Sequence, residues 1–169
     1  TCMEYANAGN VWPEGALDTI HEYRMDLERR IGKKIGDAED PLLVSVRSGA
    51  PMSMPGMMDT VLNLGLNDES INGLIKQTEN PRFAWDSYRR FIQMFSNVVM
   101  GLDGDLFENA ITAMKNIRGV ASDTDLTAED LQELVREFKD IFSDNVSAEK
   151  YPSLVVDGVV EFPQDPMVQ

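Results

Sequence analysis

The feature that most constrains the fold is a long amphipathic segment that begins at Asn80-Pro81. An asparagine at the N-cap, followed by proline at the first helical position, is a strong signal for the start of a helix. Beyond it, apolar residues recur every three or four positions, which is the period of a helix with one buried face. We therefore expect this helix to form the centre of a hydrophobic core, with a buried face made of Ala84, Trp85, Tyr88, Phe91, Ile92, Phe95, Val98 and Val99.

Three further helices are expected beside it. One should begin near Asp68 or Ser70, and another at Thr127, because Thr127 and Asp130 have the spacing of a capping box. A third should open at a similar pair, Asp105 and Glu108, and the residues expected on the three core faces are Ile71, Leu74, Ile75, Phe107, Ile111, Met114, Leu131, Leu134, Val135, Phe138, Ile141 and Phe142. Residues 69–150 thus read as an all-helical bundle with mostly local contacts, which we expect to fold without the rest of the chain.

The remaining segments mix helix and strand. A helix should follow Pro13 and end at Gly32, and short apolar runs predict a buried strand at 42–47 and a second strand at 61–64. Weak alternation around Asp157-Gly158 favours a short hairpin or an extended return within 154–162. The expected fold class is α+β and predominantly helical. The expected domain organisation is a first subdomain over 1–68, the inserted bundle over 69–150, and a return segment over 151–169.

Composition excludes several classes of function. A net charge of −14 over 169 residues argues against a nucleic-acid or anionic-membrane partner. Cys2 is the sole cysteine, so no intrachain disulfide is possible, and a reducing, cytoplasmic location is expected. His21 is the sole histidine, which excludes mechanisms that need a histidine pair, and its charged neighbours indicate a solvated surface residue.

The candidate site is the segment that follows the strand at 42–47. The strand ends in Arg47, and a small-residue turn and a loop with two prolines, Gly56 and four methionines come next. An arginine fork together with the backbone N–H groups of a small-residue loop is a common way to hold phosphate oxygens. The alternative is a surface turn whose arginine pairs with a nearby carboxylate, and the residue types alone leave both interpretations open.

The longer pattern around this loop resembles a known family. Val-Arg-Ser-Gly-Ala at 46–50, Ser-Met-Pro-Gly-Met-Met-Asp-Thr at 53–60, Asn-Pro-Arg-Phe at 80–83 and Asp-Ser-Tyr-Arg-Arg-Phe-Ile-Gln-Met at 86–94 resemble the nucleotide-binding domain of pyruvate, phosphate dikinase. The resemblance spans most of the chain. It implies part of an ATP-grasp-type nucleotide-binding domain into which the helical bundle is inserted.

The resemblance also implies a chemistry. Such an enzyme interconverts ATP, phosphate and pyruvate with AMP, pyrophosphate and phosphoenolpyruvate, using Mg²⁺ and a phosphohistidine carried elsewhere in the polypeptide. Arg47 would bind and neutralise the transferring phosphates, and Gly56 would let the loop backbone approach them, while Met57 and Met58 exclude water. The remaining residues of the implied nucleotide site are Ser48, Asp59 and Thr60. The other domains of the same polypeptide would be its partners in a homodimeric enzyme, the metal ligands would lie outside this chain, and the chain alone would be inactive.

Two alternatives stay open at this point. One is a non-catalytic, acidic helical interaction module with an exposed methionine loop, since methionine-rich loops make adaptable binding surfaces. The other is a related dikinase such as phosphoenolpyruvate synthase, although that family lacks the Met-Pro-Gly-Met-Met loop. We expect loop 49–60 of this chain to be mobile without nucleotide and to close over bound phosphates. The alternative is a loop held shut by its methionines packing into the helical unit.

Overall fold

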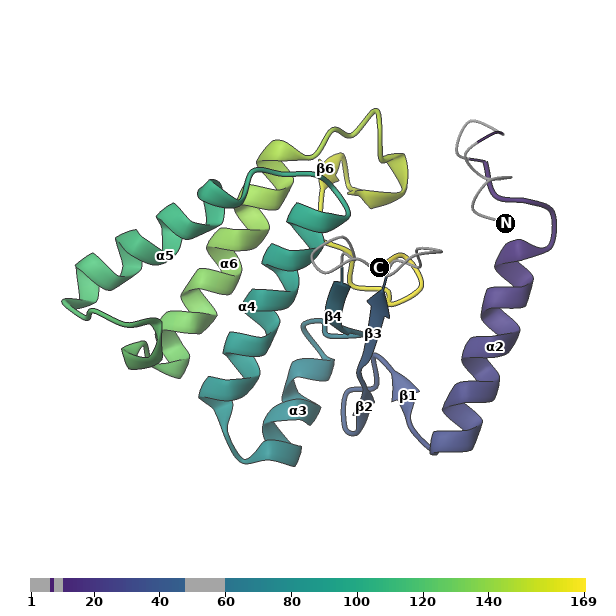
Figure 1. Ribbon diagram of the computed structural model, residues 1–169, viewed down its shortest axis with the longest axis horizontal. Coiled ribbons are helices and arrows are strands. Elements are labelled where there is room, and N and C mark those ends of the chain that lie inside the picture. The colour runs from purple at the N-terminus through teal and green to yellow at the C-terminus, as the bar shows by residue number, and fades with distance from the viewer. Residues whose placement is uncertain (1–6, 8–10, 48–59) are drawn as a thin grey trace, which may run out of the picture. The chain divides into compact units, whose positions relative to one another are not determined.

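The computed structural model describes residue 7, residues 11–47 and residues 60–169. Contacts within the chain divide it into two compact units, Thr1–Lys34 and Ile35–Gln169. The expected domain boundaries near 68 and 150 remain predictions. Figure 1 shows that helices dominate the described parts and that the strands are short, so the fold is α+β and mostly helical.

The described part of the first unit consists mainly of one helix, α2 (Ala16–Ile31). It begins three residues after Pro13, because Gly15 has a left-handed backbone conformation with φ of 74°. It ends as expected at Gly32, which is also left-handed and donates its N–H to the Glu28 carbonyl. None of its residues is buried, and Leu17 is 51% exposed. His21 is exposed too.

The second unit contains the hydrophobic core. Its helices are α3 (Ser70–Thr78), α4 (Pro81–Val98), α5 (Gly104–Arg118) and α6 (Ala128–Asn145), with 3-10 turns η1 (Asp123–Asp125) and η2 (Pro152–Leu154). Its strands form three two-stranded sheets: β1 (Lys34–Ile35) with β2 (Pro41–Leu42), β3 (Val44–Arg47) with β4 (Thr60–Leu64), and β5 (Val155–Val156) with β6 (Val159–Val160). The predicted strand at 61–64 and the predicted hairpin around Asp157-Gly158 are therefore confirmed.

Helix α4 is the centre of the core, as the sequence indicates. It packs against α3, α5, α6 and β4, and Figure 1 shows α4 and α6 running side by side. Tyr88, Phe91 and Ile92 are fully buried, and Phe95 is 1% exposed. The expected buried face is too long at its C-terminal end, because Val98 and Val99 are 39% and 46% exposed. They lie where α4 ends, at its last residue and its C-cap.

The helix starts are partly as predicted. Asn80 accepts a hydrogen bond from the Phe83 N–H, and Thr127 and Asp130 form a complete capping box. Helix α5, however, is capped by Asp103, two residues before the expected Asp105. Asp103 has an extended backbone, and its side chain accepts a hydrogen bond from the Asp105 N–H.

The strand predicted at 42–47 is wrong in one respect: it is not buried. A break separates β2 from β3, and β3 is exposed over its last three residues, with Val46 at 53%. Apolar runs of this length suggest a strand buried on both faces. Among the described residues β3 pairs only with β4, in a two-stranded sheet, and its last three side chains stay exposed.

The core does not stop where the helical bundle stops. Val61 and Leu66 join it from before α3, and Leu154, Val160 and Phe162 join it from after α6. Phe162 lies in edge-to-face contact with three aromatic rings of the bundle, those of Phe91, Phe95 and Phe142. The C-terminal segment is thus part of the same core.

Candidate functional site

Arg47 lies at the end of the β3–β4 hairpin that adjoins the connecting residues 48–59. The strands are antiparallel, and Arg47 is the register partner of Thr60, so these two predicted site residues are neighbours across the hairpin. Arg47 is exposed, and within the described ranges no ion-pair or hydrogen-bond partner of its guanidinium is found. The other predicted site residues, Ser48, Gly56, Met57, Met58 and Asp59, lie outside the described residues, as does the predicted mobility of loop 49–60.

Strand β4 carries an irregularity that shapes this hairpin. Val44 faces Leu64 and Val46 faces Val61, so β4 holds one residue more than β3 over this stretch. Asn63 lies in that interval with a left-handed backbone, φ of 61°. Such a bulge bends and twists the strand, and it sets the direction in which the hairpin presents Arg47.

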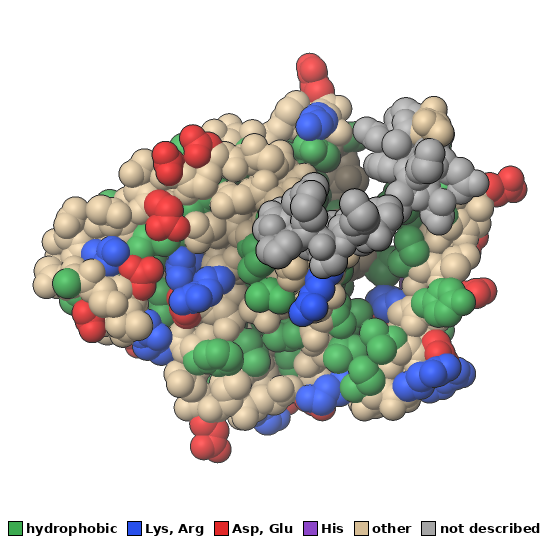
Figure 2. Space-filling model, in the orientation of Figure 1, with side chains coloured by type: hydrophobic (Ala, Val, Ile, Leu, Met, Phe, Trp, Pro, Cys, Tyr) green, Lys and Arg blue, Asp and Glu red, His purple; other side chains and the backbone are tan. Residues whose placement is uncertain are grey.

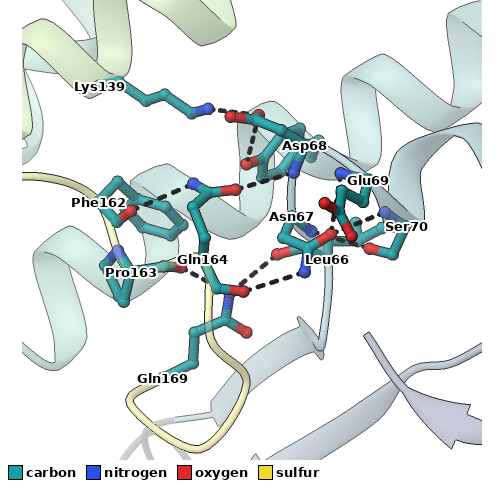
Figure 3. Close-up of polar contacts among 11 residues, drawn as sticks. Leu66, Asn67, Asp68, Glu69, Ser70, Lys139, Phe162, Pro163, Gln164 and Gln169 are labelled. Atoms are coloured by element: carbon teal, nitrogen blue, oxygen red, sulfur yellow. Dashed lines mark hydrogen bonds and ion pairs between the residues drawn. The ribbon is translucent and has the colours of Figure 1, made fainter. Parts of the chain in front are cut away.

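The other end of β4 is tied to the C-terminal segment by two glutamine side chains (Figure 3). Gln169 accepts a hydrogen bond from the Gly65 N–H at 2.9 Å, and its Nε2 group donates to the carbonyls of Leu66 at 2.9 Å and Pro163 at 2.8 Å. Gln164 accepts from the Asp68 N–H at 2.9 Å. We call the turn Gly65–Ser70 together with these two glutamines the glutamine clamp.

Asn67 organises the turn from inside. Its Oδ1 accepts from the backbone N–H groups of Glu69 at 3.0 Å and Ser70 at 2.7 Å, and its Nδ2 donates to the Gln164 carbonyl at 3.0 Å. Asn67 therefore does what we expected of Asp68 or Ser70, because it satisfies the free N–H groups that precede α3. The Ser70 hydroxyl instead donates to the Gly65 carbonyl at 2.9 Å.

A charged group borders the clamp. Asp68 accepts a hydrogen bond from the Tyr88 hydroxyl at 3.0 Å and pairs with Lys139, whose Nζ lies 5.2 Å from the centre of the Tyr88 ring. Burial, and secondarily the negative charge of Asp68, raises the pKa of Tyr88 well above its usual value. The phenol therefore stays protonated and acts as a fixed donor that links α4 to the turn.

Comparison with known proteins agrees with the motifs around Arg47. A pyruvate, phosphate dikinase of Clostridium symbiosum is 56% identical over 151 residues, which are 89% of this chain and 17% of that protein. A pyruvate, phosphate dikinase of Giardia intestinalis is 52% identical over 83% of this chain and 16% of its own length. A chloroplastic pyruvate, phosphate dikinase 1 of Oryza sativa subsp. japonica is 51% identical over 90% of this chain and 16% of its own length. No protein-family model matches the chain.

By sequence, this chain matches a segment of pyruvate, phosphate dikinases. It spans about a sixth of the length of the dikinases that it matches. Most of the sequence of those dikinases therefore has no counterpart in this chain.

The site in this dikinase segment contains residues that sequence reasoning did not single out. Asn67, Gln164 and Gln169 are neutral and lie in connecting segments, where amide side chains are common and carry no periodic signal. Besides local bonds, each takes part in a hydrogen bond with a residue about 100 positions away in the sequence, and only the tertiary structure brings these groups together.

The described residues hold no group of three or more histidine, cysteine or acidic side chains that could bind a metal ion. Figure 2 shows acidic and basic side chains interspersed over the face of the helical part in this view. None of the helices among the described residues is long and apolar enough to cross a membrane.

Proposed function

We propose that this segment binds the phosphates of ATP in a pyruvate, phosphate dikinase. That enzyme would catalyse the reversible conversion of ATP, phosphate and pyruvate into AMP, pyrophosphate and phosphoenolpyruvate. The observation that carries the proposal is the exposed Arg47 at the hairpin end, beside Thr60 and without an acidic partner among the described residues. A guanidinium without an acidic partner among the described residues keeps its donors available for an incoming anion.

The geometry fits a stabilising role for Arg47. Phosphoryl transfer places developing negative charge on oxygens that the protein must hold and neutralise, and a guanidinium fork can donate two parallel hydrogen bonds to them. Together with loop residues 48 and 56–60, Arg47 would form one wall of a nucleotide site in an ATP-grasp-type domain, with the α3–α6 bundle inserted into it. The phosphohistidine would lie elsewhere in the enzyme.

No group of three or more histidine, cysteine or acidic side chains that could hold a metal ion lies among the described residues. Mg²⁺ would come with the nucleotide and be held by the remaining part of the enzyme, and the role of Arg47 does not depend on a metal ligand in this chain. For the same reason we propose that the 169-residue chain alone has no dikinase activity. The single cysteine fits a reducing compartment, and we place the enzyme in the cytoplasm as a homodimer.

The test is an Arg47→Lys substitution in the intact dikinase that contains this segment. Lysine keeps the charge but loses the fork, so we expect the nucleotide half-reaction to slow by about 10²- to 10³-fold while the pyruvate half-reaction is unchanged. Arg136→Lys is the matched control, because Arg136 is also exposed and lies on α6. An Arg47→Lys enzyme within a few-fold of the control refutes the proposal and favours a non-catalytic module.

A further inference from the structure

The glutamine clamp uses nearly all the hydrogen-bonding capacity of one side chain. Both Nε2 protons of Gln169 are donated to backbone carbonyls, and its Oε1 accepts from a backbone N–H. The three backbone groups come from two segments, the end of β4 and the stretch after the core residue Phe162. Because both segments are fixed by the same planar amide, neither can shift without breaking a bond.

The turn held by the clamp has little freedom to adapt. Gly65 has φ of 104°, and a Cβ added there would lie 2.8 Å from the Ile35 side chain and 3.0 Å from the Leu42 carbonyl. Its own carbonyl is engaged by the Ser70 hydroxyl. A tightly packed turn with satisfied polar groups transmits a displacement instead of absorbing it.

The clamped turn continues directly into the strand that is paired with Arg47. Leu64 faces Val44 at the clamped end, and Thr60 faces Arg47 at the other end of the same ladder. Along β4, α4 provides the remaining anchor through burial of Val61 and the Leu62 N–H, which donates to Met94 Sδ at 3.4 Å. A thioether is a weak acceptor, so the stronger directional bonds are those of the clamp.

We propose that Gln169 and Gln164 are positioning residues for the nucleotide half-reaction. Gln169 holds the backbone that directly follows β4, and Gln164 holds Asp68 in the same turn. Through the β3–β4 ladder they set the position from which Arg47 contacts the phosphates. The inference rests on the proposed function of Arg47. Neither glutamine contacts Arg47's end of the hairpin, because both bind the turn at the opposite end of β4. The proposal therefore gives two neutral side chains an effect on the reaction that does not require contact with the phosphates.

The experiment uses the intact dikinase with Gln169→Ala and Gln169→Glu. Glutamate keeps an acceptor for the Gly65 N–H but has no donor for the Leu66 and Pro163 carbonyls. Gln164→Leu removes the acceptor for the Asp68 N–H and provides an independent variant should the Gln169 variants fail to fold. Gln77→Ala is the matched control for loss of a glutamine, because Gln77 is exposed and bonds only Asp40 among the described residues.

Misplacement of a catalytic group by about 1 Å can cost about 100-fold in rate. We expect the clamp variants to lower kcat of the nucleotide half-reaction by about 10- to 100-fold, with KM for ATP changed only a few-fold and the pyruvate half-reaction unaffected. Amide hydrogen exchange in residues 60–66 should become faster in the same variants. A merely structural role would lower thermal stability without a selective loss of kcat in the nucleotide half-reaction. Met114→Ala, which truncates a buried residue of α5, measures the effect of lost stability alone.

Three outcomes separate the two proposals. Loss of kcat in both the Arg47 and the clamp variants supports the positioning role. Loss in Arg47→Lys together with wild-type kcat in the clamp variants, or a loss no greater than that of Met114→Ala at equal thermal stability, overturns the positioning role alone. Full activity of Arg47→Lys overturns the proposed function, and the positioning role with it.

Discussion

Truncation of Phe162 tests whether the C-terminal segment belongs to the cooperative core. The ring is 2% exposed, and its centroid lies 5.6 Å from that of Phe91, 5.4 Å from Phe95 and 5.3 Å from Phe142. The interplanar angles of 76–86° are edge-to-face geometries, which stabilise aromatic pairs beyond the area that they bury.

The size of the effect follows from these contacts. Phenylalanine-to-alanine changes in cores lower the free energy of unfolding by about 3–5 kcal/mol. Because the Phe162 ring is enclosed by three other rings, we expect Phe162→Ala to cost about 4 kcal/mol. With a urea dependence of about 2 kcal/mol per molar, the unfolding midpoint should fall by about 2 M. Phe162→Leu keeps most of the volume and should cost clearly less.

The assay is urea unfolding of the 169-residue chain, followed by circular dichroism at the helical band. Val159→Ala is the control, since Val159 lies in the same hairpin but is 56% exposed and should change stability by no more than about 0.5 kcal/mol. A midpoint shift for Phe162→Ala no larger than that of the control would show that the tail is not part of the core. The excised segment 69–150 lacks Phe162, so the space among the three surrounding rings is left unfilled.

We therefore expect residues 69–150 alone to unfold less cooperatively than the whole chain.

Two further predictions concern the turn and its neighbours. Gly65→Ala should destabilise the chain by more than about 1 kcal/mol, because it adds a steric clash to a positive φ. Gly101→Ala, where φ is 73° and no atom lies within 4 Å of the added Cβ, should cost less in the same urea assay, and equal costs would contradict the close approach at Gly65. Tyr88 has a raised pKa in the folded state, so it contributes stability below the pKa of about 10 of an unfolded tyrosine and loses that contribution as the pH rises through its folded pKa. Stability should therefore fall above about pH 10, and less steeply in Tyr88→Phe; absorbance at the tyrosinate band that shows Tyr88 ionising before unfolding would refute this.

Much of this protein is already determined by local sequence. The helix starts at Asn80 and Thr127 and the end of α2 at Gly32 follow from short-range hydrogen bonding and from the backbone freedom of glycine. The buried face of α4 follows from its periodicity, because a helix must bury its apolar stripe against something. Arg47 as the candidate phosphate ligand, and the dikinase resemblance around it, were also accessible from the order of residues alone.

Other features depend on contacts between residues far apart in the chain. The exposure of β3 could not be predicted, because an apolar run does not reveal whether other elements will pack on its faces. Nor could the burial of Phe162 among α4 and α6, since one aromatic residue after a hairpin has no periodic partner. The glutamine clamp is the clearest case: Gln164 and Gln169 carry no charge and no pattern, and their function as donors and acceptors arises only when folding brings them to the backbone of Gly65–Ser70. Local interactions define the helices and the turns, whereas the hydrogen bonds that tie the turn after β4 to the C-terminal segment span about 100 residues.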